Sequence, residues 1–406
     1  MVRTAALAAL VALALVACGT QYVDPIQRAP VPSADACGDW LTESECLADA
    51  VHGCSFQPNP LGCETTDPKC TSGSCRSGDP FVRRRPGQGL WLLGQPYRFV
   101  GTVSWGIAWG NDCQVARMPD QETALARVFD DLVELKVTVL KVWAFQSYAG
   151  ASGSDYASFE RVVAAARRAG VRLIFVLENQ HEQDCTSGPP RNDAWYASGY
   201  ASPYGDYALS FADYARGLAR HFRDEPTILA WEILHEGRAD DFNAVSAFTE
   251  AMSSVIREND PNHLIVLGLD NGDSPATDRN ESPSNYERLH DHPAVDMLDA
   301  HDFAAPGTPL PDAMAELATI ASSLGKPIFA GATAVELADS SAASFGVRAE
   351  RVEAKLHAAF DAGYVGFLVY DYIPDWQDVR WSFDTRVEDP LAGPNGVLVR
   401  NAIPSP

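Results

Sequence analysis

The feature that most constrains the fold is a regular alternation of apolar runs with amphipathic segments, which begins near residue 86. Eight short runs rich in β-branched and aliphatic residues lie at residues 97–103, 137–143, 171–177, 228–234, 264–267, 297–301, 328–331 and 366–370. Segments with helical spacing separate them, at residues 121–135, 159–169, 207–222, 242–258, 312–324 and 345–362. Eight such repeats in one chain favour a (β/α)8 TIM barrel, an α/β fold, over an open doubly wound sheet. We predict this barrel over residues 86–403, with residues 89–97 forming a hairpin that closes its bottom.

The N-terminus predicts export and attachment to a membrane. Arg3 precedes an apolar run, residues 5–17, that is too short to span a bilayer. The run ends in Leu15-Val16-Ala17-Cys18-Gly19, which resembles a bacterial lipobox. The resemblance implies that residues 1–17 are a lipoprotein signal peptide and that Cys18 is lipidated after cleavage. The chain would then be extracytoplasmic and anchored at the outer membrane or cell surface; an ordinary secretory signal is the alternative.

Eight cysteines remain after Cys18, an even number that suits disulfide bonds in an oxidising compartment. Residues 18–36 contain three prolines and few apolar residues, which predicts a linker behind the lipid anchor. Six cysteines lie within residues 37–78, where we predict a small disulfide-rich module. A zinc site is the weaker interpretation, because the CxxC spacing is absent.

Charge and motif content exclude several classes of function. The formal net charge is −23, from 54 acidic and 31 basic residues, and such a surface repels nucleic acid. No glycine-rich nucleotide-binding motif is present, so we expect no cofactor. The sequence clusters around His181 and His290, and the acidic loop 270–278, lack a convincing ligand spacing, so we predict no metal site. We expect a monomer.

Polar and aromatic side chains gather where the predicted strands end, which is the active face of a TIM barrel. Carboxylates, imidazoles and indoles of this kind fit a sugar ligand, because indole faces stack on sugar C–H groups and polar groups bind hydroxyls. The predicted substrate-binding residues are Trp105, Trp109, Trp143, Glu178, Asn179, His235, His301, Tyr370 and Trp376. Trp143 and Trp231 could equally be core residues, whereas Trp109, Trp195 and Trp376 are expected to be exposed.

Residues 226–236, PTILAWEILHE, resemble the fourth-strand signature of glycoside hydrolase family 5 and its clan A relatives. The segments that begin at Tyr97, Leu140, Ala300 and Gly325 resemble the first, second, sixth and seventh strands of endo-β-mannanases in the same order. The resemblance implies that Glu236 is the general acid/base and that the nucleophile follows Gly331.

The sequence departs from the family at catalytic positions. Ala332 occupies the nucleophile position, and a methyl group cannot form a glycosyl-enzyme intermediate. Four further positions also differ from the family's usual residues: Lys141, His235, Gly237 and Tyr370. Asp371 is the best substitute carboxylate, since an inverting pair with Glu236 is conceivable.

Two cysteines lie on predicted active-face loops, Cys113 and Cys185, and we expect them to form a disulfide at the rim of the cleft. The sequence thus predicts a surface lipoprotein that recognises a β-linked polysaccharide, β-mannan or β-glucan, with retaining hydrolysis weak or lost. Two alternatives stay open. One is an active endo-β-glycanase that uses Glu236 with a partner such as Asp371, and the other is a structural surface protein with a vestigial cleft.

Overall fold

The structure is a computed structural model. It describes residues 79–104, 107, 121–150, 152–180, 191–269, 283–303, 309–372, 382–383 and 389–403, together with the short strands 55–57 and 74–76. Among these residues, no helix combines the length and apolar character that crossing a membrane requires. The predicted signal peptide, Cys18, the linker and the Cys113–Cys185 disulfide lie outside the described residues.

Eight parallel strands form the predicted barrel. The sheet order is β10-β9-β8-β7-β6-β13-β12-β11, and a parallel bridge from Val266 to Met297 connects β10 to the start of β11 and closes the ring. The strands are β6 (Phe99–Val103), β7 (Val139–Trp143), β8 (Arg172–Val176), β9 (Ile228–Glu232), β10 (Leu264–Val266), β11 (Leu298–Asp302), β12 (Ile328–Thr333) and β13 (Gly366–Val369). Each lies within or next to one of the eight apolar runs, so the (β/α)8 prediction is confirmed.

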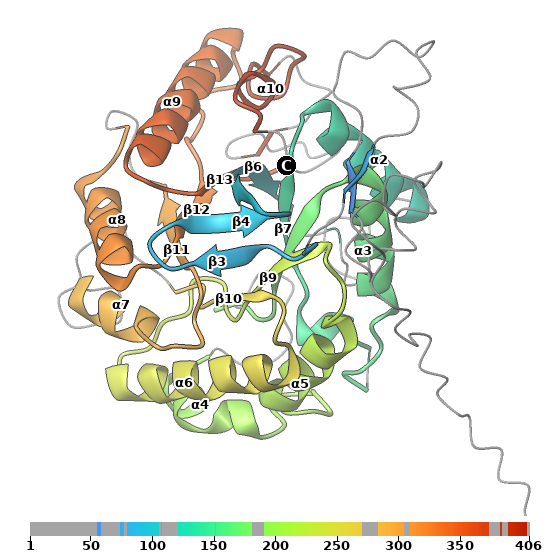
Figure 1. Ribbon diagram of the computed structural model, residues 1–406, viewed down its shortest axis with the longest axis vertical. Coiled ribbons are helices and arrows are strands. Elements are labelled where there is room, and N and C mark those ends of the chain that lie inside the picture. The colour runs from blue at the N-terminus through green and yellow to red at the C-terminus, as the bar shows by residue number, and fades with distance from the viewer. Residues whose placement is uncertain are drawn as a thin grey trace, which may run out of the picture.

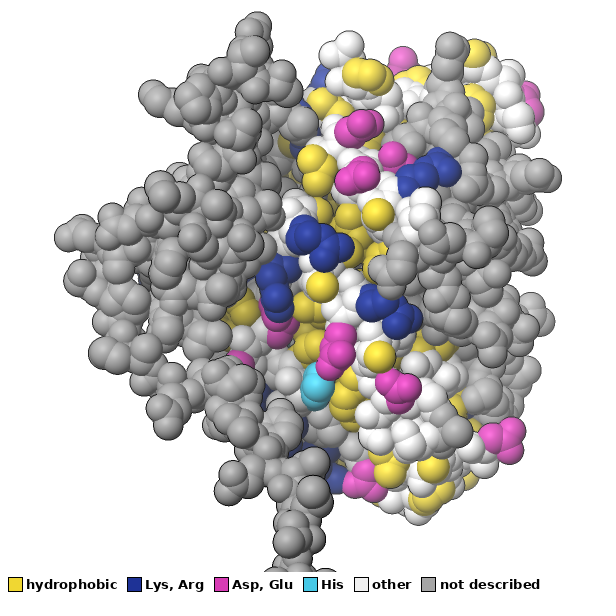
Figure 2. Space-filling view, turned by 90° about the vertical axis from the view of Figure 1, so that its right-hand side faces the viewer, with side chains coloured by type: hydrophobic (Ala, Val, Ile, Leu, Met, Phe, Trp, Pro, Cys, Tyr) yellow, Lys and Arg dark blue, Asp and Glu magenta, His cyan; other side chains and the backbone are white. Residues whose placement is uncertain are grey.

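Helices surround the strands on the outside of the ring (Figure 1). They are α2 (Gln121–Glu134), α3 (Ala157–Ala169), α4 (Asp193–Ala197), α5 (Phe211–Phe222), α6 (Phe242–Asn259), α7 (Pro283–His290), α8 (Asp312–Leu324), α9 (Ala342–Asp361) and α10 (Val397–Arg400). Polar N-caps fix several starts: Ser210 accepts a hydrogen bond from the Asp213 amide of α5, and Asp241 accepts from the amides of Asn243 and Ala244 in α6. Basic and acidic side chains are interspersed on the face that carries α2 and α3 (Figure 2).

A small antiparallel sheet precedes the first barrel strand. It contains β3 (Arg83–Arg85), β4 (Gly89–Leu92) and β5 (Gln95–Tyr97), and β4 and β5 form the predicted hairpin. Because β5 ends just before β6 begins, the hairpin lies at the amino-terminal ends of the barrel strands, with Leu90 and Leu92 buried. Two further strands, β1 (Ser55–Gln57) and β2 (Ser74–Arg76), pair antiparallel within the segment predicted to be the cysteine-rich module.

The barrel strands are buried on both faces, as expected for a sheet with helices outside and packed side chains inside. Every residue of β6, β7, β9 and β11 is buried. Aromatic rings pack near the bottom of the interior, where the rings of Phe99 and Phe329 lie 5.8 Å apart. Charged residues also occur in these strands, among them Lys141, Glu232 and Asp299, and they form the floor of the candidate site.

Candidate active site

Glu236 lies just beyond the carboxyl end of β9. The backbone amides of the residues before and after it are both hydrogen-bonded. The His235 amide donates to the Glu178 carbonyl at 2.7 Å, and the Gly237 amide donates to the Gly268 carbonyl at 2.9 Å. These bonds extend the barrel ladder past the strands on both sides of Glu236. Its own φ is +55°, an uncommon conformation for a residue with a side chain. The side chain is 20% exposed and can therefore meet a ligand in the cleft.

His301 of β11 connects Glu236 to a second carboxylate. Its Nδ1 lies 2.7 Å from Oε1 of Glu236, and its Nε2 lies 3.5 Å from Oδ2 of Asp299. Burial lowers the pKa of His301, but the contacts with Asp299 and Glu236 outweigh that effect and raise the pKa to about 9. At neutral pH the imidazole is therefore protonated between two carboxylates.

His235 packs between Trp143 and His301. Its ring centroid lies 4.6 Å from that of Trp143 and 5.2 Å from that of His301. Its Nε2 is 3.9 Å from Oε1 of Glu236, and its Nδ1 is 3.9 Å from Oε1 of Glu232. Three strand ends, β7, β9 and β11, thus bring their rings together below the mouth of the barrel.

A buried ion pair forms the floor beneath these rings. Lys141 Nζ lies 2.5 Å from Oε1 of Glu232, and both side chains are fully buried. Burial raises the pKa of Glu232 to about 7, against the lowering effect of Lys141. Glu232 therefore lies below the accessible Glu236, paired with Lys141 and shielded from solvent.

Ala332 lies on β12 beside His301. It is fully buried, and its Cα is paired with that of His301 in the ladder between β11 and β12. Two half-buried aromatic residues extend the wall: the Phe303 ring lies 6.3 Å from His301 and 5.5 Å from Tyr370. The described residues thus bring together the accessible carboxylate of Glu236, the His301 imidazole, aromatic faces and the methyl group of Ala332.

Asp371, the proposed substitute carboxylate, is 1% exposed. Burial is the main cause that lowers the pKa of Arg348 on α9. The negative charges of Asp389 and, to a smaller extent, Asp371 act against this lowering. The charge of Asp371 therefore acts on a buried arginine of α9.

Three of the predicted substrate-binding residues are almost fully buried, and for Trp143 this matches the core position that the sequence left open. Glu178 is 1% exposed, and its Oε2 lies 2.6 Å from Nη2 of the buried Arg191, so an ion pair occupies it. Asn179 and Trp143 are both 2% exposed. The expectation that Trp195 is exposed is wrong, since it is 1% exposed and packs against Phe211 and Phe248.

Some predicted residues cannot be placed. Trp105, Trp109, Trp376, Cys113 and Cys185 lie outside the described residues, as does the acidic loop 270–278. His290, from one of the sequence clusters considered for a metal site, is fully buried. Burial lowers the pKa of His290 to about 4, and its Nδ1 bonds the Tyr286 carbonyl.

The sequence analysis missed two partners that complete the site. Asp299 contacts His301, and Arg191 neutralises Glu178. An acidic residue inside the predicted strand 297–301 was a usable signal for Asp299. Arg191 gave no such signal, because its pairing with Glu178 depends on the path of the chain between them.

The comparisons with known proteins agree with this geometry. The sequence model described as cellulase, glycosyl hydrolase family 5, matches residues 95–372, more than half of the chain. The chain belongs to glycoside hydrolase family 5. Among curated relatives, mannan endo-1,4-beta-mannosidase 2 of Oryza sativa subsp. japonica is 28% identical over 243 residues, which cover 53% of this chain and 51% of that protein. Mannan endo-1,4-beta-mannosidase 7 of Arabidopsis thaliana is 24% identical over 259 residues, 55% of this chain and 58% of that protein.

A solved structure supports the fold. The endo-1,4-beta-mannanase from Rhizomucor miehei superimposes with a TM-score of 0.60 at 16% identity, covering 79% of this chain and 99% of that chain. The chain spans only about half the length of the curated relatives it matches. Family membership and the barrel are therefore established, while substrate and activity belong to the proposal that follows.

Proposed function

We propose that this family 5 chain recognises a β-linked polysaccharide, with β-mannan the first candidate and β-glucan the second, and that its retaining hydrolysis is weak or lost. The single observation that carries the proposal is Ala332 at the position of the family's nucleophile. Retaining hydrolysis needs two carboxylates about 5 Å apart, one to protonate the leaving group and one to attack the sugar. Glu236 can serve as the first, and a methyl group cannot serve as the second.

The neighbours of Ala332 support binding without turnover. Phe303 and Tyr370 offer half-buried aromatic faces beside His301, which suit the apolar faces of a sugar ring. The mannan-directed names of the curated relatives point to β-mannan, and the family description points to cellulose-like glucans. We further propose that the chain is held at the cell surface through Cys18, with the cysteine-rich segment 37–78 as a stapled spacer.

Ala332→Glu tests the proposal. The variant restores a carboxylate on β12 beside His301, so we expect reducing-sugar release from mannan that the natural chain lacks. Because Ala332 is fully buried, the larger side chain should cost about 1–3 kcal/mol of stability. Ala332→Gln is the matched control: it has similar bulk, cannot act as a nucleophile, and should stay inactive.

The rival is an active glycanase in which Glu236 works with another carboxylate such as Asp371. It predicts that the natural chain already releases sugar, that Asp371→Asn abolishes the release, and that the product has inverted anomeric configuration. The remaining alternative is a structural protein with a vestigial cleft. If it were correct, the chain would bind no glycan on an array.

A further inference from the structure

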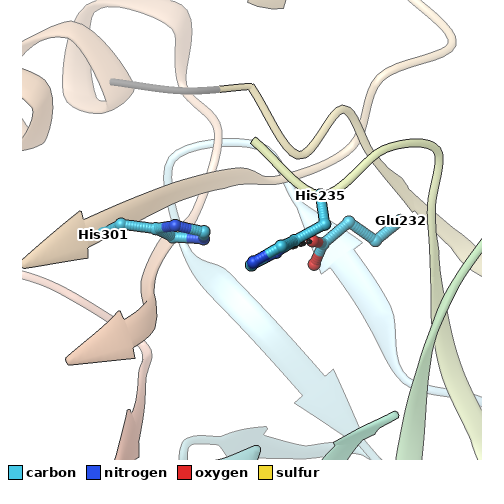
Figure 3. Close-up of side chains that lie close together, drawn as sticks. All are labelled: Glu232, His235 and His301. Carbon is cyan, nitrogen blue, oxygen red and sulfur yellow. Dashed lines mark ion pairs between the residues drawn. The ribbon is translucent and has the colours of Figure 1, made fainter. Parts of the chain in front are cut away.

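The floor of the cleft brings together a set of metal-binding side chains that the sequence does not reveal. Glu232, His235 and His301 each offer one ligand atom, and these three atoms lie within 4.8 Å of one another. Glu232 comes from β9, His235 from the turn after it, and His301 from β11. In Figure 3 the two imidazoles point toward each other, and the Glu232 carboxylate lies behind the His235 ring. We propose that these residues form a site for a divalent transition-metal ion, with zinc the best fit.

The ligand set and its geometry suit such an ion. Two imidazoles and one carboxylate form a common three-residue set for zinc, which leaves a fourth position open. In tetrahedral zinc sites the ligand atoms lie roughly 3.4 Å apart, so the longest separation here would close by at most about 1.4 Å. Rotation of the side chains supplies that movement, and the barrel strands that carry the residues need not shift.

Glu232 supplies an independent observation. Glu232 is fully buried, and within the described part of the chain no hydrogen-bond donor reaches its Oε2. Lys141 forms an ion pair with Oε1, which leaves Oε2 buried without a donor. A buried carboxylate oxygen in that state is costly, and a bound cation would satisfy it.

Charge balance around the site favours a divalent ion. Three carboxylates, those of Glu232, Glu236 and Asp299, surround the two imidazoles, and Lys141 contributes one ammonium group. A divalent cation bound among these carboxylates would offset their negative charge. A metal bound to one nitrogen of His301 would replace one of its two carboxylate contacts. The other contact then orients its ring, as carboxylates commonly do for metal-bound histidines.

His235 explains why this chain would bind a metal where its relatives would not. The fourth-strand signature of family 5 has asparagine at this position. An amide is a far poorer zinc ligand than an imidazole. Replacing His235 with that asparagine therefore removes one ligand while keeping a side chain the fold accepts.

The test is zinc binding by the full chain after removal of metal with dipicolinic acid. Isothermal titration with ZnCl2 should show a sub-micromolar site in the natural chain that His235→Asn weakens by more than about tenfold. His357→Gln is the control, because His357 is exposed on α9, and it should bind zinc as the natural chain does. Residues 37–75 contain six cysteines, and reduced cysteines also bind zinc. The quantity to compare is therefore the zinc affinity of the variants, and not the total zinc bound.

Cobalt provides a second readout on the natural chain that does not depend on any variant folding. Co²⁺ bound to nitrogen and oxygen ligands should give visible ligand-field bands without thiolate charge transfer. Equal zinc affinity in the natural chain and folded His235→Asn would overturn the proposal. So would a cobalt spectrum with only thiolate charge transfer, or with no binding.

Discussion

Buried charges set the character of the site at the scale of single residues. Lys141 and Glu232 stand inside the apolar strands β7 and β9, so the sequence alone indicates that each is buried. Their pairing at 2.5 Å depends on the register of β7, β8 and β9, which residue patterns do not specify. Glu178 shows the same limit, since its place at a strand end predicted a ligand contact, and its actual partner is Arg191.

Glu178→Gln should therefore lower the stability of the fold, and it should not remove a direct contact with a glycan. The change leaves the buried Arg191 guanidinium without its counter-charge, and breaking a buried pair in this way costs about 3–5 kcal/mol. Urea denaturation followed by tryptophan fluorescence measures the loss.

Glu353→Gln is a matched control, because Glu353 pairs with Arg400 at the surface of α9. Its cost should stay below about 1 kcal/mol. If Glu178→Gln kept full stability and lost only mannan affinity, Glu178 would be a ligand contact after all.

Among the elements, the end of β9 matters most for function. The chain turns there through Leu234, His235 and Glu236, and the next strand must pass very close to it. Gly268, with φ +68°, makes that approach possible: a Cβ at this position would lie 1.5 Å from the Leu234 carbonyl oxygen. The Gly268 carbonyl also accepts the bond from the Gly237 amide that fixes the backbone beside Glu236.

Gly268→Ala should therefore disturb both stability and glycan binding. A left-handed conformation alone costs a residue with a Cβ about 1–2 kcal/mol, and here the clash with Leu234 adds to that cost. Gly87→Ala isolates the first effect, because Gly87 has φ +67° and open space around it. Thermal unfolding should show a larger loss for Gly268→Ala, with weaker mannan binding only in that variant; equal losses would contradict this account.

The elements themselves were largely predictable. All eight barrel strands lie in or next to apolar runs, because strands buried on both faces must be apolar almost throughout. The short α7 and α10 were poorly marked, since eight and four residues are too few to show a helical period. Segment order specifies the topology, whereas residue contacts such as His301 with Glu236 depend on how the strand ends converge.

For the whole molecule, fold and family are established, and in our proposal the chemistry depends on one missing carboxylate. The barrel brings Glu236, His301 and aromatic side chains together at the carboxyl ends of its strands, and we propose that Ala332 stands where the family has its nucleophile. A shared fold does not guarantee a shared reaction. The central claim is therefore that the cleft retains its ligand and has lost the family's route to cleave it.

The most direct test mixes one preparation of the natural chain with a β-1,4-mannan oligosaccharide and measures both binding and cleavage. Titration calorimetry measures binding, and chromatography of the same mixture measures cleavage. We predict saturable binding with no products, in the natural chain and in Glu236→Ala alike. Oligosaccharide products that form with the natural chain and disappear in Glu236→Ala would contradict the account.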